Sequence, residues 1–536
     1  MEFKVNYLLL KGSQVACFNN AKATYEILAD TQNPKSLANS LKLQKQPLLI
    51  IDTYLLPKIF YNELMKLWPD LPVLAFDDYG EKSDLPLLGV INPGLGAEHI
   101  AYPGRFALFS ALGPEYMPLP KTCLQERSNF IPQKANIGPV KRLLLVMGGG
   151  DPENQTIRIL NLLKNMEDAL QVDIVAGPQY GSTHQLEKIC SDASNLVLHH
   201  NPHDFHALAS NCDLAVTGGG LIVYEMLYLR VPVCALALAT NQEPTTQELG
   251  KGGLGVNLGR FDEVSDQDIA EKLKKAWSDP LGLQAMSKKG RKLLDGRGAS
   301  RLAGRILEIA AHYRGERFSL KDVTDEYNKS ASEPETYKKA CWGSREGMEN
   351  RFDLSLQAMK SQNIDSWLDV GCGSGDFLLY AENHNFKIKN FTGIDVSPEI
   401  IQFARNRSYN TDIVNFRIQD FTNPVAGEPF ELVTSLGVIQ KCGINLDTAI
   451  SRLGELVKPG GKLLITTKNL DWDAFDNPVC TPYPGHHWFR VEQIKQAFSK
   501  CGLTILKFTG FEPRQGIFLS SAKAHSIMVL ATKENA

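Results

Sequence analysis

The chain has 536 residues, with 43% hydrophobic and 22% charged residues and a formal net charge of −3. This length exceeds what one hydrophobic core supports and predicts two or three domains. The slightly negative charge gives no electrostatic case for a nucleic-acid partner, and the ten cysteines form no Cys-x-x-Cys pair that would indicate a zinc site or a disulfide framework.

No apolar run reaches the length of a membrane span, and the run near the amino terminus is too short for the core of a signal peptide. The scattered cysteines fit a reducing compartment. We therefore expect a cytoplasmic protein without an integral membrane segment, acting on a small molecule.

The first segment alternates short apolar runs with helical stretches. Strands are predicted at 5–10, 47–52 and 72–78, and helices at 21–29 and 58–67. This alternation is typical of a parallel sheet covered by helices on both faces. Ligands of such sheets lie beyond the carboxyl ends of the strands.

A second set of apolar runs predicts a second parallel sheet, with strands at 141–147, 172–176, 196–199, 214–216 and 231–236. Glycines follow two of them, at Gly148–Gly150 and Gly218–Gly220. A glycine turn at the start of a helix offers backbone N–H groups to a diphosphate, and Glu225 could accept hydrogen bonds from ribose hydroxyls.

Several motifs in this region resemble those of the nucleotide-sugar hydrolases of the pseudaminic acid pathway, which share the GT-B architecture of MurG-type glycosyltransferases. The matching stretches, spread over roughly residues 1–260, are Phe76–Asp78, Gly113–Tyr116, Met147–Asp151, Gly219–Gly220 with Glu225, and Asn241–Glu243. The resemblance implies that the second sheet binds UDP, with Gly149, Gly219, Gly220 and Glu225 at the nucleotide, and that Asn241 and Gln242 face the sugar.

One family feature is missing from the chain. Family members begin with a strand and a G-x-G-H loop, whereas no histidine precedes His99 here. Lack of a catalytic base costs roughly 10²–10⁴-fold in rate. The sequence therefore favours a module that binds a nucleotide sugar. The alternatives are an active UDP-sugar hydrolase or glycosyltransferase and a non-catalytic platform that binds a partner.

Residues 262–309 are predicted to be helical, with a start signal at Asp266–Asp268 and a break at Gly296–Gly298. Interrupted apolar periodicity near 313–325 marks a boundary. We expect three domains, at 1–135, 136–315 and 316–536.

The last domain contains a short apolar strand that ends in the sequence Asp369-Val-Gly-Cys-Gly-Ser-Gly375. Gly371, Gly373 and Gly375 would allow the backbone to approach a flat nucleoside closely, with helix N–H groups facing its polar atoms. Such a motif alone is often structural, and its third glycine comes one residue too early for the NAD-binding fingerprint G-x-G-x-x-G.

Further strands follow in order, and two of them end in acids. The strand at 391–395 ends in Asp395, where one carboxylate could bind both ribose hydroxyls. The strand at 414–418 precedes Asp420 and Phe421, which would lie beside adenine. Strands are also predicted at 430–436 and 462–466.

This ordered set, over roughly residues 325–535, resembles the class I S-adenosylmethionine-dependent methyltransferases. The resemblance implies that the glycine loop after Asp369 holds the methionine part of the cofactor. It also implies that Asp395 with Val396 contacts the ribose, that Asp420 with Phe421 contacts the adenine, and that Leu436 lines the site. The segment at 327–352 resembles the lid of small-molecule methyltransferases, in which Trp342 would cover the cofactor and Arg345 would contact its carboxylate.

The acceptor side is less defined. No Asn-Pro-Pro-Tyr motif follows the strand at 430–436, which argues against the nucleobase and amide methyltransferases that use it. His486 and His487 lie between the fifth strand and a helix predicted from Val491, and either could be a general base.

Together these observations predict an α/β multidomain protein with GT-B-like Rossmann domains followed by a Rossmann-like methyltransferase domain. By resemblance, the methyl acceptor is an oxygen or nitrogen of a sugar intermediate in bacterial surface-glycan synthesis, of the nonulosonic acid type.

Overall fold

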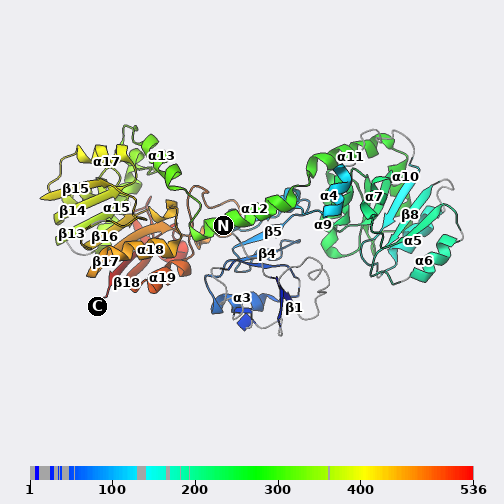
Figure 1. The fold of residues 1–536 in the computed structure, drawn as a ribbon, viewed down its shortest axis with the longest axis horizontal. Helices are drawn as coiled ribbons and strands as arrows, with labels where there is room; N and C mark the ends of the chain where they lie inside the picture. The colour runs from blue at the N-terminus through cyan, green and yellow to red at the C-terminus, as the bar shows by residue number, and fades with distance from the viewer. Residues whose placement is uncertain are drawn as a thin grey trace.

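The computed structural model describes residues 7–10, 25–28, 34–35, 37–38, 47–53, 55–128, 140–151, 153–164, 170–181, 183–191, 193–359, 363–425 and 427–534. These residues form three α/β units, and the long helix α12 (Gly298–Arg314) runs beside the central unit from the second unit toward the third (Figure 1). The parallel sheets and covering helices confirm the predicted α/β multidomain class.

The central unit is built on a parallel four-stranded sheet. Its strands, in order, are β3 (Leu49–Ile51), β4 (Val73–Phe76), β5 (Gly89–Asn92) and β6 (Ala111–Leu112). Helix α3 (Lys58–Leu67) matches its predicted range and buries Phe60, Tyr61 and Leu64, whose spacing places them on one helix face.

A separate parallel pair joins β1 (Tyr7–Leu10) and β2 (Tyr25–Leu28), with Tyr7 opposite Tyr25. The helix predicted at 21–29 is therefore wrong where the structure describes it. Pairing with a distant strand overrides the weak helical preference of this stretch, because tertiary context outweighs local propensity. The remainder of 21–29, like the start of the strand predicted at 5–10, lies outside the described residues.

The second unit is a six-stranded parallel sheet in the order β12-β11-β10-β7-β8-β9. The strands are β7 (Arg142–Val146), β8 (Gln171–Ala176), β9 (Leu196–His200), β10 (Leu214–Gly218), β11 (Val233–Ala237) and β12 (Val256–Arg260), and the first five confirm predicted strands. Its helices are α4 (Lys121–Ser128), α5 (Gln155–Lys164), α6 (Thr183–Ser191), α7 (Phe205–Ser210), α8 (Ile222–Leu229) and α9 (Glu243–Lys251).

Three helices follow this sheet. Helix α10 (Asp266–Trp277) starts where the sequence predicts, because the hydroxyl of Ser265 accepts a hydrogen bond from the N–H of Asp268. Helix α11 (Pro280–Leu293) comes next. Helix α12 then places Leu302 and Ile309 in one apolar cluster with Trp488 of the third unit and core residues of the central sheet.

The third unit contains an eight-stranded sheet in the order β15-β14-β13-β16-β17-β20-β18-β19. The parallel strands are β13 (Asn363–Val370), β14 (Lys387–Asp395), β15 (Ile413–Ile418), β16 (Phe430–Leu436) and β17 (Val457–Lys468). The antiparallel strands are β18 (Leu503–Glu512), β19 (Ile517–Leu519) and β20 (Ser526–Lys533).

Helices cover this sheet on both faces. They are α13 (Leu320–Ser330), α14 (Thr336–Lys339), α15 (Arg345–Met359), α16 (Asp376–Asn383), α17 (Pro398–Arg405), α18 (Leu446–Glu455) and α19 (Val491–Lys500). Two apolar clusters result, one on each face. Across the described part of the chain, no helix is both long and apolar enough to cross a membrane.

Candidate functional site

The glycine loop between β13 and α16 has the backbone conformation that its composition predicts. Gly371, Gly373 and Gly375 have φ values of +72°, +51° and +76°, a region that other residues enter only with strain. A Cβ atom on Gly371 would lie 2.2 Å from Cγ2 of Val438. The conformation of the loop therefore requires glycine at these positions. At Gly371 there is also no room for a side chain.

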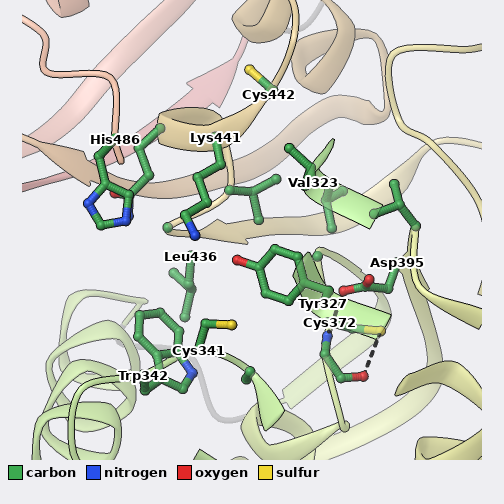
Figure 2. A pocket seen from close by; sticks show the side chains of 18 of the residues that line it. Val323, Tyr327, Cys341, Trp342, Cys372, Asp395, Leu436, Lys441, Cys442 and His486 are labelled. Carbon is green, nitrogen blue, oxygen red and sulfur yellow. Dashed lines mark hydrogen bonds between the residues drawn. The ribbon is translucent and has the colours of Figure 1, made fainter. Parts of the chain in front are cut away.

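Asp395, at the end of β14, holds this loop in place. Its Oδ2 accepts a hydrogen bond from the N–H of Gly373 at 3.1 Å, and its Oδ1 accepts one from the N–H of Ser397 at 3.0 Å. Burial raises the pKa of the Asp395 carboxyl above its ordinary value, although these backbone bonds counteract the shift. The side chain lies on the cavity wall (Figure 2), within reach of a ligand hydroxyl.

Asp369, on the neighbouring strand, is the more deeply buried of the two acids. Its Oδ1 accepts a hydrogen bond of 2.6 Å from the hydroxyl of Thr434, which in turn accepts one of 2.8 Å from the indole N–H of Trp367. Burial raises the pKa of Asp369 to about 7. This carboxyl therefore titrates in the physiological range, unlike an exposed aspartate.

A cavity of about 770 Å³ opens at the carboxyl ends of these strands. Most of the cofactor residues predicted from sequence line it, and they are Asp369, Gly371, Gly373, Asp395, Val396, Asp420, Phe421, Leu436 and Trp342. Gly375, Arg345 and His487 are not among its lining residues. The chain thus brings together residues from four strand ends and from the segment before β13.

Helix α13 covers part of this cavity. Tyr327 points from α13 into the cavity, near Asp395 (Figure 2). Nζ of Lys441 lies 5.5 Å from the centre of the Tyr327 ring and 2.5 Å from a carboxylate oxygen of Glu326 on the same helix. Residues of α13 therefore line the cavity from before the start of the segment predicted as a lid, 327–352.

Arg351, rather than Arg345, reaches the cavity from α15. Arg345 is exposed at the start of the helix, and six residues later the helix has turned to another face. The guanidinium of Arg351 lies 4.2 Å from the ring of Trp342 and 5.5 Å from that of Phe511, and its buried Nε has no hydrogen-bond partner among the described residues. Burial lowers the pKa of Arg351 to about 10. The sequence offered no periodic signal that distinguishes these two arginines.

The connection from Asn469 to Arg490, here named the acceptor loop, contains both predicted histidines. Their side chains lie in different surroundings. His486 lines the cavity, and burial lowers its pKa to about 3. His487 points into the core instead, where its Nε2 lies 3.3 Å from the carbonyl oxygen of Cys442 and its ring lies 5.3 Å from that of His312 on α12. A fully buried side chain off the cavity cannot contact a methyl acceptor there.

The glycines and amides predicted to bind a nucleotide sugar lie at the ends of three adjacent strands of the second sheet, and Glu225 lies on α8. Gly149 follows β7, Gly219 and Gly220 follow β10, and Asn241 and Gln242 follow β11. Gly149 is exposed, and a Cβ added to it would meet nothing within 4 Å, whereas a Cβ on Gly219 would lie 2.6 Å from Thr246. Packing alone therefore explains Gly219, while Gly149 leaves room for a ligand.

Two side chains in this region already have protein partners. Oε1 of Gln242 accepts hydrogen bonds from the N–H groups of Gly219 and Leu238, at 3.0 and 2.9 Å. Oε2 of Glu225 lies 2.9 Å from Nε2 of His206. Gln242 thus fixes the backbone of the turn after β10. Only one of the two carboxylate oxygens of Glu225 contacts His206.

Comparison with known proteins assigns the third unit. Residues 362–505 match a protein family described as a methyltransferase domain. This part of the chain is a methyltransferase domain. Its cavity fits S-adenosylmethionine, the cofactor of this domain, because it combines a glycine cradle, a buried carboxylate at a strand end and an arginine whose buried Nε lacks a partner among the described residues.

Relatives of known sequence fall into two groups. The spore coat polysaccharide biosynthesis protein SpsG of Bacillus subtilis (strain 168) is 22% identical over 285 residues, which are 52% of this chain and 82% of that protein. The ubiquinone biosynthesis O-methyltransferase of Xanthomonas euvesicatoria pv. vesicatoria (strain 85-10) is 36% identical over 112 residues, 20% of this chain and 45% of that protein. The chain spans about half the length of such curated methyltransferase relatives.

Solved structures give a weaker likeness. The N-methyltransferase NodS from Bradyrhizobium japonicum WM9, in complex with S-adenosyl-L-homocysteine, is 17% identical, with a TM-score of 0.30. The match covers 39% of this chain and 97% of NodS.

Proposed function

We propose that the chain methylates an oxygen or nitrogen of a sugar intermediate in bacterial surface-glycan biosynthesis, of the nonulosonic acid type. The observation that carries this proposal is the cavity at the ends of β13–β17, in a chain that is also similar, over 285 residues, to a polysaccharide biosynthesis protein. The methyltransferase domain supplies the reaction, and the likeness to SpsG supports the class of acceptor.

Each lining residue has a role that its chemistry supports. The glycine loop and Asp395 bind the adenosine ribose, because a buried carboxylate accepts hydrogen bonds strongly. Asp420 and Phe421 bind the adenine. Arg351 pairs with the methionine carboxylate, which would satisfy its Nε, and Trp342 covers the methionine part of the cofactor.

The first two units bind the nucleotide-linked sugar in this proposal. Gly149 and Gly220 contact the diphosphate through backbone N–H groups, Glu225 contacts the ribose, and Asn241 faces the sugar. The open space around Gly149 supports a ligand at this strand end.

Calorimetric titration of the full chain with UDP tests the amino-terminal half. Binding that Glu225→Gln weakens supports a nucleotide-sugar module, with Glu187→Gln, an acid on α6 of the same unit, as the control. If no heat of binding is measured at millimolar UDP, the remaining interpretation is a non-catalytic platform that binds a partner. Release or transfer of sugar from UDP-sugars would instead show a bifunctional enzyme.

Incubation of the full chain with S-adenosylmethionine and a panel of nucleotide sugars and nonulosonic acids tests the acceptor class. Mass spectrometry should detect a gain of one methyl group on one member of the panel. Methylation of a quinone precursor or a protein lysine, with none of the sugars methylated, would contradict the proposal.

A further inference from the structure

Lys468 lies at the acceptor end of the cavity, where no role has been assigned to it. It is the last residue of β17 and lines the cavity together with His486 and His525. Its Nζ lies 3.4 Å from Nδ1 of His525 and 5.7 Å from the centre of the Trp488 ring. Among the residues that the structure describes, no carboxylate forms an ion pair with it.

The charged groups around Lys468 do not favour its ammonium form. Arg351 faces it from α15, and Glu512 and Arg514 face it from the end of β18 and the turn that follows, so that two cations oppose one acid. His486 approaches from the acceptor loop and His525 from the position just before β20, and both are neutral near pH 7. Lys468 is half-buried. An ammonium held partly away from water without a counter-ion is costly, so a lysine in such surroundings loses its proton more readily.

The titration of these groups agrees with their geometry. Burial, with the charge of Arg351 as the second cause, lowers the pKa of Lys468 to about 7. Burial lowers the pKa of both His486 and His525 to about 3. A base works best when its pKa lies near the working pH, so the two histidines are poor proton acceptors and the lysine is a suitable one.

We infer that the amine of Lys468 takes up the proton that the methyl acceptor loses, an inference that rests on the proposed methyltransferase function. As the acceptor oxygen or nitrogen forms its bond to the methyl carbon, the carbon–sulfur bond breaks and its electron pair stays on sulfur. The acceptor O–H or N–H proton moves to Nζ, which becomes an ammonium. The positive charge lost at sulfur thus reappears on Lys468, which later returns the proton to solvent.

His525 positions this amine. Its Nδ1 also lies 3.1 Å from the hydroxyl of Ser526, and its ring packs edge-on against Trp472 and Trp488, each at 5.3 Å. A neutral imidazole held in this way can accept a hydrogen bond from Nζ without adding charge. His525 is therefore a positioning residue rather than the proton acceptor.

Competitive labelling of the full chain with acetic anhydride across pH 5–11 tests the inference without an acceptor or a cofactor. The acetylation of each lysine is quantified by mass spectrometry. Lys462, six residues earlier on β17, is the internal control. We expect the reactivity of Lys468 to be half-maximal near pH 7, far below the ordinary lysine value of about 10.4.

Three outcomes are informative. A midpoint for Lys468 near the ordinary lysine value of about 10.4 would overturn the inference, and so would an amine that does not react at any pH, because it would not be open to the cavity. Arg351→Met should move the midpoint of Lys468 to higher pH, whereas Lys462→Met should leave it unchanged. If Arg351→Met leaves the midpoint of Lys468 unchanged, the charge of Arg351 does not lower the pKa of Lys468.

Cofactor binding separates this inference from the proposed function. Lys468→Met should bind S-adenosyl-L-homocysteine within about twofold of the unsubstituted chain. If the unsubstituted chain does not bind it, the proposed function fails whatever the lysine titration shows. With an acceptor identified, Lys468→Met should lose roughly 10²–10⁴-fold in kcat, while His486→Ala should retain most of its activity. The reverse result would assign the proton to His486.

Discussion

At the scale of single residues, the two buried acids of the methyltransferase domain differ in what surrounds them. Asp395 accepts two backbone hydrogen bonds, whereas Asp369 accepts one from a threonine hydroxyl. The first retains more of its capacity to bind a ligand as a carboxylate. Burial raises the pKa of both carboxyls, and that of Asp369 reaches about 7, which makes the domain sensitive to pH.

Asp395→Ala should weaken the binding of S-adenosyl-L-homocysteine by about 1–3 kcal/mol, because charge-assisted hydrogen bonds to the ribose are lost. Isothermal titration measures this loss. The control is Asp365→Ala, which removes an exposed carboxylate near the other end of the sheet, paired with Lys389. Equal affinities for both variants would remove Asp395 from the ribose site.

Asp369→Asn should stabilise the domain at high pH. The folded pKa of about 7 lies above the ordinary value of 3.8, so the folded state binds more protons between these values and its stability falls as pH rises through them. Asparagine cannot ionise, and we expect it to relieve at least about 1 kcal/mol at pH 8, or roughly 2–4 °C in Tm.

The difference in Tm between Asp369→Asn and the unsubstituted chain should grow from pH 5 to pH 8. Asp365→Asn should give a constant difference over the same range, because the pKa of Asp365 is lowered by Lys389. A difference that is equally constant for Asp369→Asn would show that its carboxyl ionises normally.

The sequence could predict the acids at this scale because each follows a strand directly, and strand ends converge on one edge of a parallel sheet. It could not predict Arg351, Tyr327 or Lys468. Their presence at the cavity depends on how α13, α15 and β17 pack, and no local pattern distinguishes them from surface residues of the same type.

At the scale of elements, most strands and helices lie where local patterns predict them. β16 (Phe430–Leu436) and α3 (Lys58–Leu67) match their predicted ranges residue for residue. The failure at 21–29 has a physical reason, since β2 forms only by pairing with β1. The antiparallel strand β20 was not predicted either, although it pairs with both β17 and β18.

Gly371→Ala should abolish cofactor binding. The substituted residue would need φ near +72° and would place Cβ 2.2 Å from Val438, and the left-handed conformation alone costs about 1–2 kcal/mol. Gly304→Ala, in α12, meets nothing within 4 Å and should stabilise its helix by about 1 kcal/mol. Isothermal titration and thermal unfolding distinguish the two effects, and a Gly371→Ala protein with full affinity would contradict the loop geometry.

The contact between α12 and the acceptor loop should be sensitive to acid. Burial lowers the pKa of His312 to about 3 and of His487 to about 4, both below the ordinary value of 6.5. Between these values the unfolded chain binds more protons than the folded chain, so this contribution to stability is full above about pH 6.5 and falls as pH decreases.

His487→Phe should reduce the loss of thermal stability between pH 7.5 and pH 5, because phenylalanine fills a similar volume and does not titrate. His184→Phe, at a side chain that is 99% exposed, should change nothing. Thermal unfolding at the two pH values provides the measurement. If His487→Phe loses as much thermal stability between pH 7.5 and pH 5 as the unsubstituted chain, the acid-sensitive group is not His487.

At the scale of the whole molecule, the methyltransferase domain is attached to the central unit by more than a linker. Arg490 donates a hydrogen bond of 2.6 Å to the carbonyl of Leu87, and Gln493 donates one of 3.1 Å to the carbonyl of Tyr313 on α12. Arg105 forms an ion pair with Asp476 of the acceptor loop. The central unit therefore holds the acceptor loop at Asp476 and Arg490, and α12 contacts the helix α19 that follows the loop.

These contacts between units could not be predicted from sequence, because their partners are separated by more than 150 positions and follow no shared periodicity. The three-domain division at 1–135, 136–315 and 316–536 remains a prediction. Helix α12 belongs to the second of these segments, yet it packs in one cluster with the first and the third.

Expression of residues 316–536 alone should give poorly soluble protein, measured as the soluble fraction after centrifugation. Separation would uncover Trp488 and Phe475, which are 2% and 1% exposed in the full chain, and exposed apolar patches of this kind promote aggregation. A longer fragment that starts at residue 298, and so keeps α12, should be more soluble. Equal solubility of the two fragments would show that α12 does not shield the apolar side chains of the acceptor loop from solvent.

The shared helix also affects how this chain can be modified by recombination. A graft that replaces the methyltransferase domain with a homologue would preserve the glycine cradle yet present an unmatched surface to α12. The donor would have to bring its own version of the acceptor loop and of the helix face beneath it. The acceptor loop and the helix face that it packs against would thus have to be exchanged together.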